Sequence, residues 1–305
     1  MFGRLVLAVA GNRAVRTAIS DSPLSRPVVS RFVAGEDDDA AITAVLALQR
    51  DGLHATLDHL GEDITDAAQA AETVAAYRKL VSRLADAGLA EGNEISLKLS
   101  ALGQALGADG PARATGNAHE LADHAYAHGV DVTIDMEDHT TIDDTLETVR
   151  SVRTRYPRVG CVLQAMLKRT EGDVRDLGEP GSRVRLVKGA YAEPGSVALT
   201  AKNEVDRAYV RYLRLLAESG AYPMVATHDP RIITIAESVL TPAGAPAEFQ
   251  MLYGIRAAEQ QRLAAAGHTV RVYIPYGTDW YGYFSRRLAE RPANVGFLLR
   301  QLTSR

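Results

Sequence analysis

Short segments rich in Val, Ile and Leu alternate along the chain with longer segments whose apolar residues recur at helical spacing. This alternation predicts β-strands separated by amphipathic helices. The eight predicted strands are residues 54–60, 95–99, 131–136, 160–166, 184–188, 222–227, 248–252 and 269–275. Several of them are almost continuously apolar, which is typical of strands that are buried on both faces of a parallel sheet.

The predicted helices between the strands end close to Gly or Pro, which stop a helix at low cost. They span residues 66–89, 117–128, 142–156, 201–219, 231–240 and 256–266. A further helix is predicted at residues 40–50, and the acidic run at residues 36–39 leads into its first turn. The first 35 residues contain Pro23 and Pro27 and few periodic positions, so they are expected to form an arm.

Eight strand–helix units favour a closed (β/α)₈ barrel, a fold that often exceeds the usual length of one domain. We therefore expect a single domain over residues 1–305. Residues 1–50 would be an N-terminal helical arm, and residues 51–305 would be the barrel, with a last helix over its mouth. The alternative is an open, doubly wound sheet, which usually has fewer strands and a glycine fingerprint. The chain contains no Gly-x-Gly sequence, so that fingerprint is absent.

Charge and cysteine content limit the possible partners and the compartment. The 305 residues include 34 Lys and Arg against 38 Asp and Glu, a net charge of −4, which disfavours nucleic-acid binding. The single cysteine, Cys161, excludes a disulfide framework and fits a reducing cytoplasm. The apolar N-terminus is interrupted by Arg4 and is too short to span a membrane. We expect a cytoplasmic protein with at most peripheral membrane association.

Several sequence motifs that mark common enzyme chemistries are absent. The sequence has no Gly-Lys pair for a P-loop and no Gly-x-Ser-x-Gly nucleophile elbow. His119 and His124 are five residues apart, so a helix would place them on different faces and they would not bind zinc together. His124 and His128 could share a face, but their helix ends at the barrel rim that does not carry active sites. We expect no metal site.

Polar residues mark the C-terminal ends of the strands, where barrel enzymes build their active sites. Lys98, Arg185 and Lys188 interrupt otherwise apolar segments, and His228 follows another strand. Four such groups at one mouth suggest an anionic or electron-rich ligand, such as a phosphate-bearing cofactor. The alternative for a single lysine is an internal ion pair, for example between Lys98 and Asp135.

The segment after the last strand, residues 279–290, combines aromatic and basic residues. If it is helical, Tyr283, Arg286, Arg287 and Glu290 lie within two turns. Two adjacent guanidinium groups could hold a carboxylate, with aromatic rings covering an apolar substrate. The alternative is a solvated helix face.

These motifs together resemble one family, the proline dehydrogenases. The resemblance covers residues 51–299 and rests on LKLSALG, VTIDMED, VRLVKGAY, ATHD, FQMLYGIR, RVYIPYG and YFSRRLAERPAN. VRLVKGAY and Tyr-x-x-Arg-Arg-x-x-x-Glu are its most specific parts. The resemblance implies a (β/α)₈ barrel that binds FAD without a dinucleotide-binding domain, and the length is similar to that of the bacterial monofunctional form.

The resemblance also implies an activity: an oxidoreductase that acts on a CH–NH bond. It would oxidise L-proline to Δ1-pyrroline-5-carboxylate by passing a hydride to flavin N5, the first step of proline degradation to glutamate. Electrons would pass to a quinone at the membrane surface, and the product to a separate pyrroline-5-carboxylate dehydrogenase.

The resemblance assigns residues to substrate and cofactor. Arg286 and Arg287 would hold the proline carboxylate, and Glu290 would pair with one of them. Tyr281 competes with Tyr283 for the aromatic position, and the count back from Arg286 favours Tyr283. The implied substrate set is Lys98, Asp135, Leu252, Tyr273, Tyr283, Arg286 and Arg287, and the catalytic set is Lys98, Asp135, Arg185, Tyr273, Arg286 and Arg287. The implied FAD set is Asp135, Met136, Gln164, Arg185, Val187, Lys188, Gly189, Ala190, Tyr191, Thr200, Lys202, Thr227, His228, Gln250 and Glu290.

Two other functions remain open on the sequence. An aldolase or isomerase barrel that binds phosphate or forms a Schiff base could use Lys98 or Lys188, and it predicts a borohydride-trappable lysine without flavin. A non-catalytic flavin-binding module predicts colour without reduction by proline.

Overall fold

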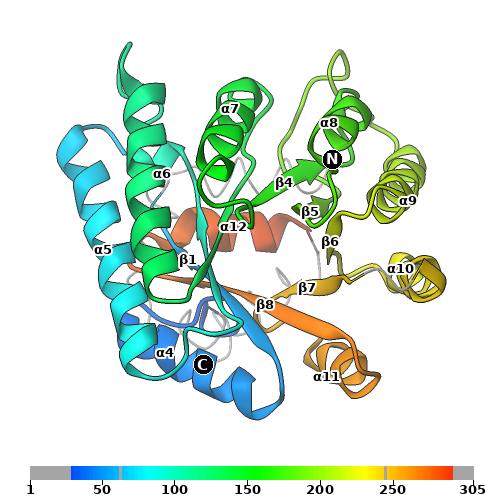
Figure 1. Cartoon of the computed structure of the whole chain (residues 1–305), viewed down its shortest axis with the longest axis horizontal. Coiled ribbons are helices and arrows are strands. Elements are labelled where there is room, and N and C mark those ends of the chain that lie inside the picture. The colour runs from blue at the N-terminus through cyan, green and yellow to red at the C-terminus, as the bar shows by residue number, and fades with distance from the viewer. Residues whose placement is uncertain (1–28, 62–63, 244–245, 291–305) are drawn as a thin grey trace, which may run out of the picture.

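Eight parallel strands close into a barrel in chain order, β1 through β8 (Figure 1). The computed structural model describes residues 29–61, 64–243 and 246–290, apart from the side chains of residues 241–243 and 288–290. The strands are β1 (His54–His59), β2 (Glu94–Leu97), β3 (Asp131–Ile134), β4 (Gly160–Gln164), β5 (Arg183–Val187), β6 (Tyr222–Ala226), β7 (Glu248–Leu252) and β8 (Thr269–Tyr276). β8 pairs with β1 from His54↔Arg271 to His59↔Tyr276, which closes the barrel. The predicted barrel is confirmed, and the open-sheet alternative is wrong.

Helices surround the barrel, and the last of them crosses its axis (Figure 1). They are α4 (Asp38–Arg50), α5 (Ala67–Asp86), the 3-10 helix η1 (Ser100–Leu102), α6 (Gly110–Ala127), α7 (Ile142–Arg153), α8 (Thr170–Leu177), α9 (Lys202–Glu218), α10 (Pro230–Ala243), α11 (Ala257–Ala265) and α12 (Trp280–Glu290). The predicted acidic start is confirmed: Asp37 caps α4 by accepting a hydrogen bond from the Ala40 N–H at 2.9 Å.

Two helices differ from the prediction for local reasons. α6 begins at Gly110 rather than at residue 117, because Gly110, Pro111 and Gly116 weaken the helical pattern. A proline in the first turn is nevertheless compatible with a helix, since its missing N–H has no partner there. α8 was not predicted, because its eight residues include Gly172 and are too few to show a periodic pattern.

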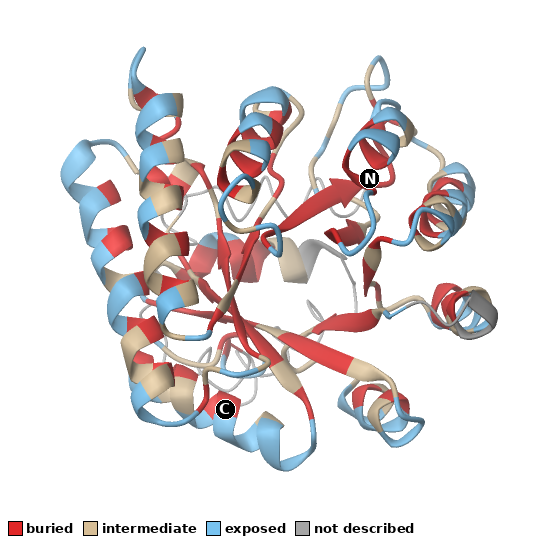
Figure 2. Cartoon of the chain, viewed as in Figure 1, coloured by how far each residue is buried: buried red, intermediate tan, exposed pale blue. Residues whose placement is uncertain are grey.

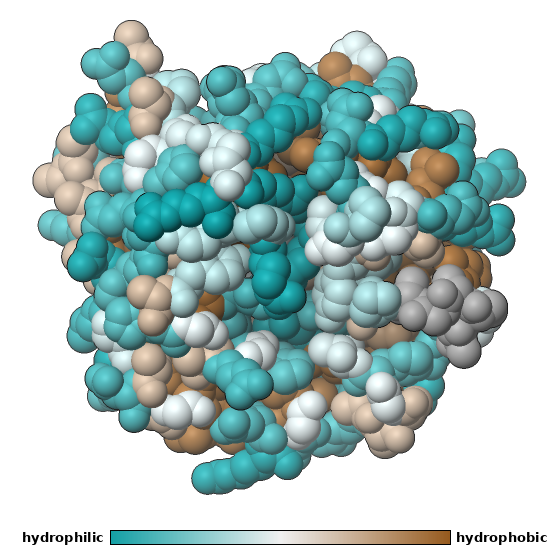
Figure 3. Space-filling model, in the orientation of Figure 1, coloured by the Kyte–Doolittle hydropathy of each residue, from teal (hydrophilic) through white to brown (hydrophobic). Residues whose placement is uncertain are grey.

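The apolar core lies between the barrel and the helices. Strand side chains that point outward, such as Leu57, Ile95 and Val272, are buried against the inner faces of the helices. Figure 2 shows the strands buried and the outer helix faces exposed, and Figure 3 shows a mostly hydrophilic surface from the same side. Burial of each large apolar side chain contributes about 1.5–3 kcal/mol. Two buried tyrosines also tie helices to strands, since the hydroxyls of Tyr77 and Tyr209 donate to backbone carbonyls in β2 and β5.

The inside of the barrel is charged rather than apolar. Glu94 of β2 is fully buried and accepts hydrogen bonds from Arg183 and Arg185 of β5, each at 2.6 Å. Arg271 of β8 binds Glu248 of β7 through two hydrogen bonds of 2.7 and 3.0 Å. Burial opposes ionisation of Glu94, but Arg271, Arg183 and Arg185 outweigh it and hold the Glu94 pKa well below its ordinary value. This ion network therefore joins four of the eight strands across the interior.

The segment before α4 connects the last helix to the barrel. Val29, Phe32 and Val33 pack with Trp280 and Phe284 of α12 in a second apolar cluster. The backbone at Arg31 lies directly against that of Gly254, the second residue after β7. A Cβ on Gly254 would lie only 1.6 Å from the Arg31 carbonyl oxygen. Residues 29–35 of the predicted arm thus help to hold α12, whereas residues 1–28 lie outside the described part of the chain.

The ion network predicts a large effect of one isosteric substitution. Glu94→Gln removes the charge that neutralises buried guanidinium groups, so we expect it to lower the free energy of unfolding by about 3–5 kcal/mol. Urea unfolding followed by circular dichroism measures this. The matched control is Glu147→Gln on the exposed face of α7, which should change stability by less than about 0.5 kcal/mol. Equal stability of the two variants would contradict the structural role of the network.

Candidate functional site

A cavity of about 430 Å³ opens at the C-terminal ends of the strands, and every strand or the residues directly after it contribute to its wall. α12 closes one side with Tyr283, Arg286 and Arg287. The lining residues are Asp58, Lys98, Asp135, Met136, Val162, Gln164, Arg185, Val187, Lys188, Gly189, Ala190, Tyr191, Ala226, Thr227, His228, Gln250, Met251, Leu252, Tyr273, Tyr283, Arg286 and Arg287. The residues predicted for substrate and cofactor therefore share one cavity, with three exceptions. Of the two candidate tyrosines on the last helix, Tyr283 lines the cavity and Tyr281 does not.

The three exceptions are Thr200, Lys202 and Glu290. Thr200 is exposed in the loop before α9. Lys202 is the first residue of α9, and its Nζ lies 2.7 Å from Oδ2 of Asp206. Glu290 is the last residue of α12, and its side chain lies outside the described part of the structure. The roles assigned to these three residues stay predictions.

The sequence analysis did not predict four of the residues that line the cavity: Asp58, Val162, Ala226 and Met251. The sequence did contain a signal for Asp58, because a carboxylate inside a predicted strand is as unusual as the lysine at position 98. Val162, Ala226 and Met251 gave no signal, since their side chains do not differ from those of other strand residues.

Lys98 lies among three oxygen acceptors. Its Nζ is 2.6 Å from Oδ1 of Asp58 and donates to the Tyr273 hydroxyl at 3.3 Å. The predicted pair with Asp135 is present at 3.7 Å, but Asp58 is closer. Asp58 is only 1% exposed, so its charge depends on this ammonium group for compensation.

Asp135 connects the cavity to the ion network below it. One carboxylate oxygen accepts from Arg185 Nη1 at 2.7 Å, and the other accepts from the Tyr273 hydroxyl at 2.8 Å. Burial raises the Tyr273 pKa well above its ordinary value, and the charges of Asp135 and Asp58 raise it further against Arg185. At neutral pH Tyr273 is therefore a protonated phenol that donates to Asp135.

Gln164 presents an acceptor that the described residues do not satisfy. Its amide nitrogen donates to the Glu137 carbonyl at 2.7 Å, whereas its Oε1 is buried and has no hydrogen-bond partner within the described ranges. Buried acceptors in folded proteins are nearly always paired. A ligand with an N–H donor would satisfy this atom.

The loop after β5 brings its backbone against the cavity. Gly189 has φ +115°, and a Cβ there would lie 2.4 Å from Sδ of Met166. Only glycine fits this backbone without displacing Met166. The adjacent Lys188 donates to Asp229 at 2.9 Å and also binds Asp206, so its charge is largely compensated.

His228 is fixed by the neighbouring strand. Its Nε2 accepts a hydrogen bond from the backbone N–H of Leu252 at 2.9 Å, so Nδ1 carries the proton of the neutral ring. Its carbonyl accepts from Arg256 Nη1 at 2.7 Å, and Arg256 adopts φ +54°. The β6 and β7 ends of the cavity are thereby held together.

Neither a metal site nor a membrane span emerges from the described residues. Within them, no three His, Cys, Asp or Glu side chains are grouped so that they could hold a metal ion. The rings of His124 in α6 and His128 directly after it lie 4.3 Å apart, and neither residue lines the cavity. None of the helices in the described ranges combines the length and the low polarity that crossing a bilayer requires.

Comparison with known proteins gives a consistent family. The family model described as proline dehydrogenase matches residues 41–300. Proline dehydrogenase from Deinococcus radiodurans is 43% identical over 277 residues, which cover 89% of each chain. Proline dehydrogenase 2 from Bacillus subtilis is 38% identical over 284 residues, which cover 92% of each chain. In fold, the chain is similar to the crystal structure of proline utilization A from Bdellovibrio bacteriovorus inactivated by N-propargylglycine, with a TM-score of 0.82 and 24% sequence identity. The similarity covers 92% of this chain and 34% of that one.

The geometry predicts energetic coupling between Asp58 and Lys98. In a double-mutant cycle with Asp58→Asn and Lys98→Met, we expect a coupling energy of about 1–3 kcal/mol, because the pair is shielded from water. Urea unfolding of the four proteins measures it.

The control cycle uses Arg78 and Glu120, whose atoms lie 2.7 Å apart but whose side chains are about half exposed. Exposed pairs of this kind contribute less than about 1 kcal/mol. A coupling at the buried pair no larger than that of the control would show that Asp58 does not hold Lys98.

Proposed function

The chain belongs to the proline dehydrogenase family, and from that premise we propose that it uses FAD to oxidise L-proline to Δ1-pyrroline-5-carboxylate. The observation that carries the proposal is that two guanidinium groups on α12 line the same cavity as the polar residues at the strand ends. Arg286 and Arg287 line it from the helix, opposite Lys98, Asp135 and Tyr273 at the strand ends. A generic phosphate-binding barrel would not require this pair.

In this proposal Arg286 and Arg287 bind the proline carboxylate. Two planar guanidinium groups match the geometry of a carboxylate better than ammonium groups do. The Arg287 guanidinium lies 5.2 Å from the centre of the Tyr283 ring, which limits the positions it can adopt. A carboxylate fixed in this way orients the rest of the substrate.

The proline ring would lie against Leu252, Tyr273 and Tyr283, which are apolar or aromatic and exclude water. Tyr273 cannot turn away from the cavity without losing its hydrogen bond to Asp135. Lys98 and Asp135 keep this tyrosine in place from two sides, at 3.3 and 2.8 Å. The floor of the proposed substrate site is therefore preorganised before substrate binds.

The residues present are suited to a flavin. Gln164 Oε1 needs an N–H donor, which an isoalloxazine ring carries, and Gly189 lines the same cavity, so its backbone could lie against a flat ring. Arg185, Val187, Ala190, Thr227, His228 and Gln250 would complete the ring site. Lys202 and Thr200 would reach the phosphate part, and Lys202 shares Asp206 with Lys188. When bound, FAD would supply the acceptor for the hydride removed from proline.

We extend the proposal to the partners that the resemblance implies. Reduced flavin would be reoxidised by a quinone at a membrane surface that the protein meets peripherally from the cytoplasm. The product would pass to a separate pyrroline-5-carboxylate dehydrogenase.

Anaerobic titration of the purified, flavin-reconstituted protein with L-proline tests the function. We expect a visible flavin band that loses its absorbance as proline is added, with D-proline as the control. A flavin band indifferent to L-proline would favour a flavin-binding module. A protein that binds no FAD but is trapped by borohydride on a lysine would favour the Schiff-base barrel.

The carboxylate site makes a kinetic prediction. Arg286→Met should lower kcat/KM for proline by at least about 30-fold, because removal of one partner of a buried charge pair costs about 2–5 kcal/mol. We expect most of the effect in KM. The control is Arg150→Met, an exposed residue of α7, which should leave steady-state kinetics unchanged. A normal KM in Arg286→Met would exclude this arginine from carboxylate binding.

A further inference from the structure

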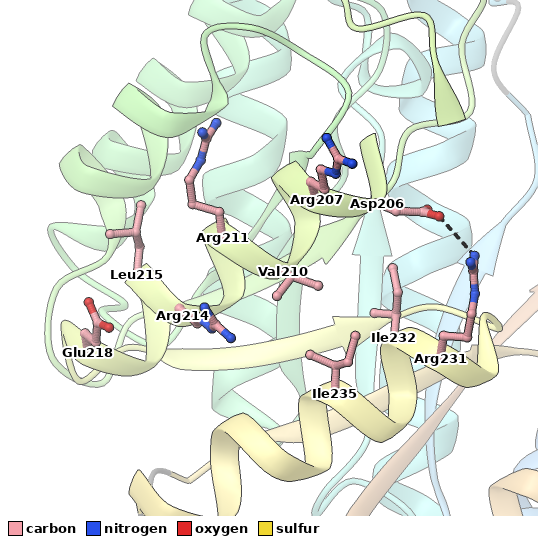
Figure 4. A pocket seen from close by; sticks show the side chains of 10 residues that line it. All are labelled: Asp206, Arg207, Val210, Arg211, Arg214, Leu215, Glu218, Arg231, Ile232 and Ile235. Carbon is pink, nitrogen blue, oxygen red and sulfur yellow. Dashed lines mark hydrogen bonds and ion pairs between the residues drawn. The ribbon is translucent and has the colours of Figure 1, made fainter. Parts of the chain in front are cut away.

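A second hollow lies on the outside of the barrel, between α9 and α10 (Figure 4). Its volume is about 670 Å³. Its apolar lining comes from Val210 and Leu215 of α9 and from Ile232 and Ile235 of α10. Ile235 is 37% exposed, and Leu46 is the only other large hydrophobic residue exposed to that extent among the described residues.

A row of arginines follows the α9 side of this groove. Arg207, Arg211 and Arg214 are exposed and recur at spacings of four and three, which places their Cα positions along one face of the helix. Arg211 pairs with Glu171 of α8 at 3.2 Å. Arg207 and Arg214 form no ion pair with any residue in the described ranges. The whole chain has a net charge of −4, so this basic row is a local concentration of positive charge.

The acidic residues of the groove do not compensate the row. Asp206 is bound by Lys188, Lys202 and Arg231. Burial raises the Asp206 pKa, but the hydrogen bonds from Lys188 and Lys202 outweigh it and hold the pKa below its ordinary value. Glu218 lies four residues beyond Arg214, so it is a neighbour on the helix, but the two form no ion pair within the described ranges. The groove therefore combines an apolar floor with an excess of positive charge.

The chain's own terminal segments have the wrong charge to fill this groove. Residues 1–28 contain four arginines and one aspartate, and residues 291–305 contain three arginines and no acidic residue. Ile232 in the floor is only 2% exposed, so the apolar contacts open to a ligand come from Val210, Leu215 and Ile235. A narrow, convex and acidic ligand suits both the shape and the charge.

We propose that the groove between α9 and α10 binds an acidic amphipathic helix of a partner protein. Apolar side chains of that helix would contact Val210, Leu215 and Ile235, and its carboxylates would pair with Arg207 and Arg214. Guanidinium groups bind carboxylates through two parallel hydrogen bonds, which fixes register as well as affinity. The proposal does not rest on the proposed enzymatic function, since the groove shares no apolar or arginine residue with the cavity.

A designed peptide tests the proposal on the full-length protein. The probe is a fluorescein-labelled helix with a leucine stripe flanked by glutamates at spacings of three and four. Fluorescence anisotropy should show saturable binding that weakens with added salt. The Arg207→Glu/Arg214→Glu variant should bind roughly tenfold more weakly, since it replaces attraction by repulsion at two sites. Ile235→Asp should weaken binding to a similar extent.

Three controls make the outcome decisive. The matched variant Arg150→Glu, on exposed α7, should bind like the wild type. A peptide with lysines in place of the glutamates should not bind. Circular dichroism should show that every variant is folded.

Three results would overturn the proposal. The first is absence of binding by the acidic peptide, or binding that both groove variants retain. The second is sedimentation with vesicles containing anionic phospholipid that is lost in Arg207→Glu/Arg214→Glu, which would identify a lipid surface as the occupant. The third is a change in the molar mass of that variant measured by light scattering, which would identify a second copy of the chain.

Discussion

The structure depends on the compensation of charge inside the barrel. A barrel of this size is usually filled with branched apolar side chains, which need no specific partners. Here Glu94, Arg183, Arg271 and Glu248 occupy the interior, and a buried ion is tolerated only when its partners are correctly placed. Strand register provides that placement, because β1 pairs with β2 through Thr56↔Glu94 and the Thr56 hydroxyl also donates to Glu94. A shift of one residue in any of these strands would reverse the direction of a charged side chain.

Arg185 carries this constraint to the functional site. Its Nη2 binds Glu94 in the interior, and its Nη1 binds Asp135 at the mouth. Its Nε donates to Gln250, which in turn donates to Glu248. One guanidinium group therefore connects the deep ion network with the floor of the cavity. The position of Tyr273 follows from the same connection, because the phenol donates to the carboxylate that Arg185 holds.

Sequence reasoning predicted the fold more completely than the contacts within the site. The bounds of β7 agree with the predicted residues 248–252, because that segment lies between clear loop residues. Glu94 and Arg183 fell just outside the predicted strands, since a charge at a segment's edge is typical of a loop. In the structure each is the first residue of its strand and points inward. Pairing of charges from β2, β5, β7 and β8 depends on register around the closed barrel, which a single sequence does not specify.

The site was predictable to the extent that chemistry is visible in residue types. Lys98, Arg185, Arg286 and Arg287 were unusual in their segments, and all four line one cavity. The ion pair between Lys98 and Asp135, named as an example, is present at 3.7 Å, but Asp58 lies closer at 2.6 Å, and that contact depends on a distance between β1 and the end of β2. The groove between α9 and α10 had no motif, since its arginines resemble any solvated helix face until the apolar residues beside them are known.

The central claim is that the buried network positions Arg185 for the cavity above it. The most direct test is a crystal structure of Glu94→Gln beside one of the wild-type protein. The account predicts that the wild type keeps Arg185 Nη1 within hydrogen-bond distance of Asp135, as in the 2.7 Å contact here, and that the variant loses this contact as the guanidinium moves. An unchanged Arg185–Asp135 contact in Glu94→Gln would contradict it.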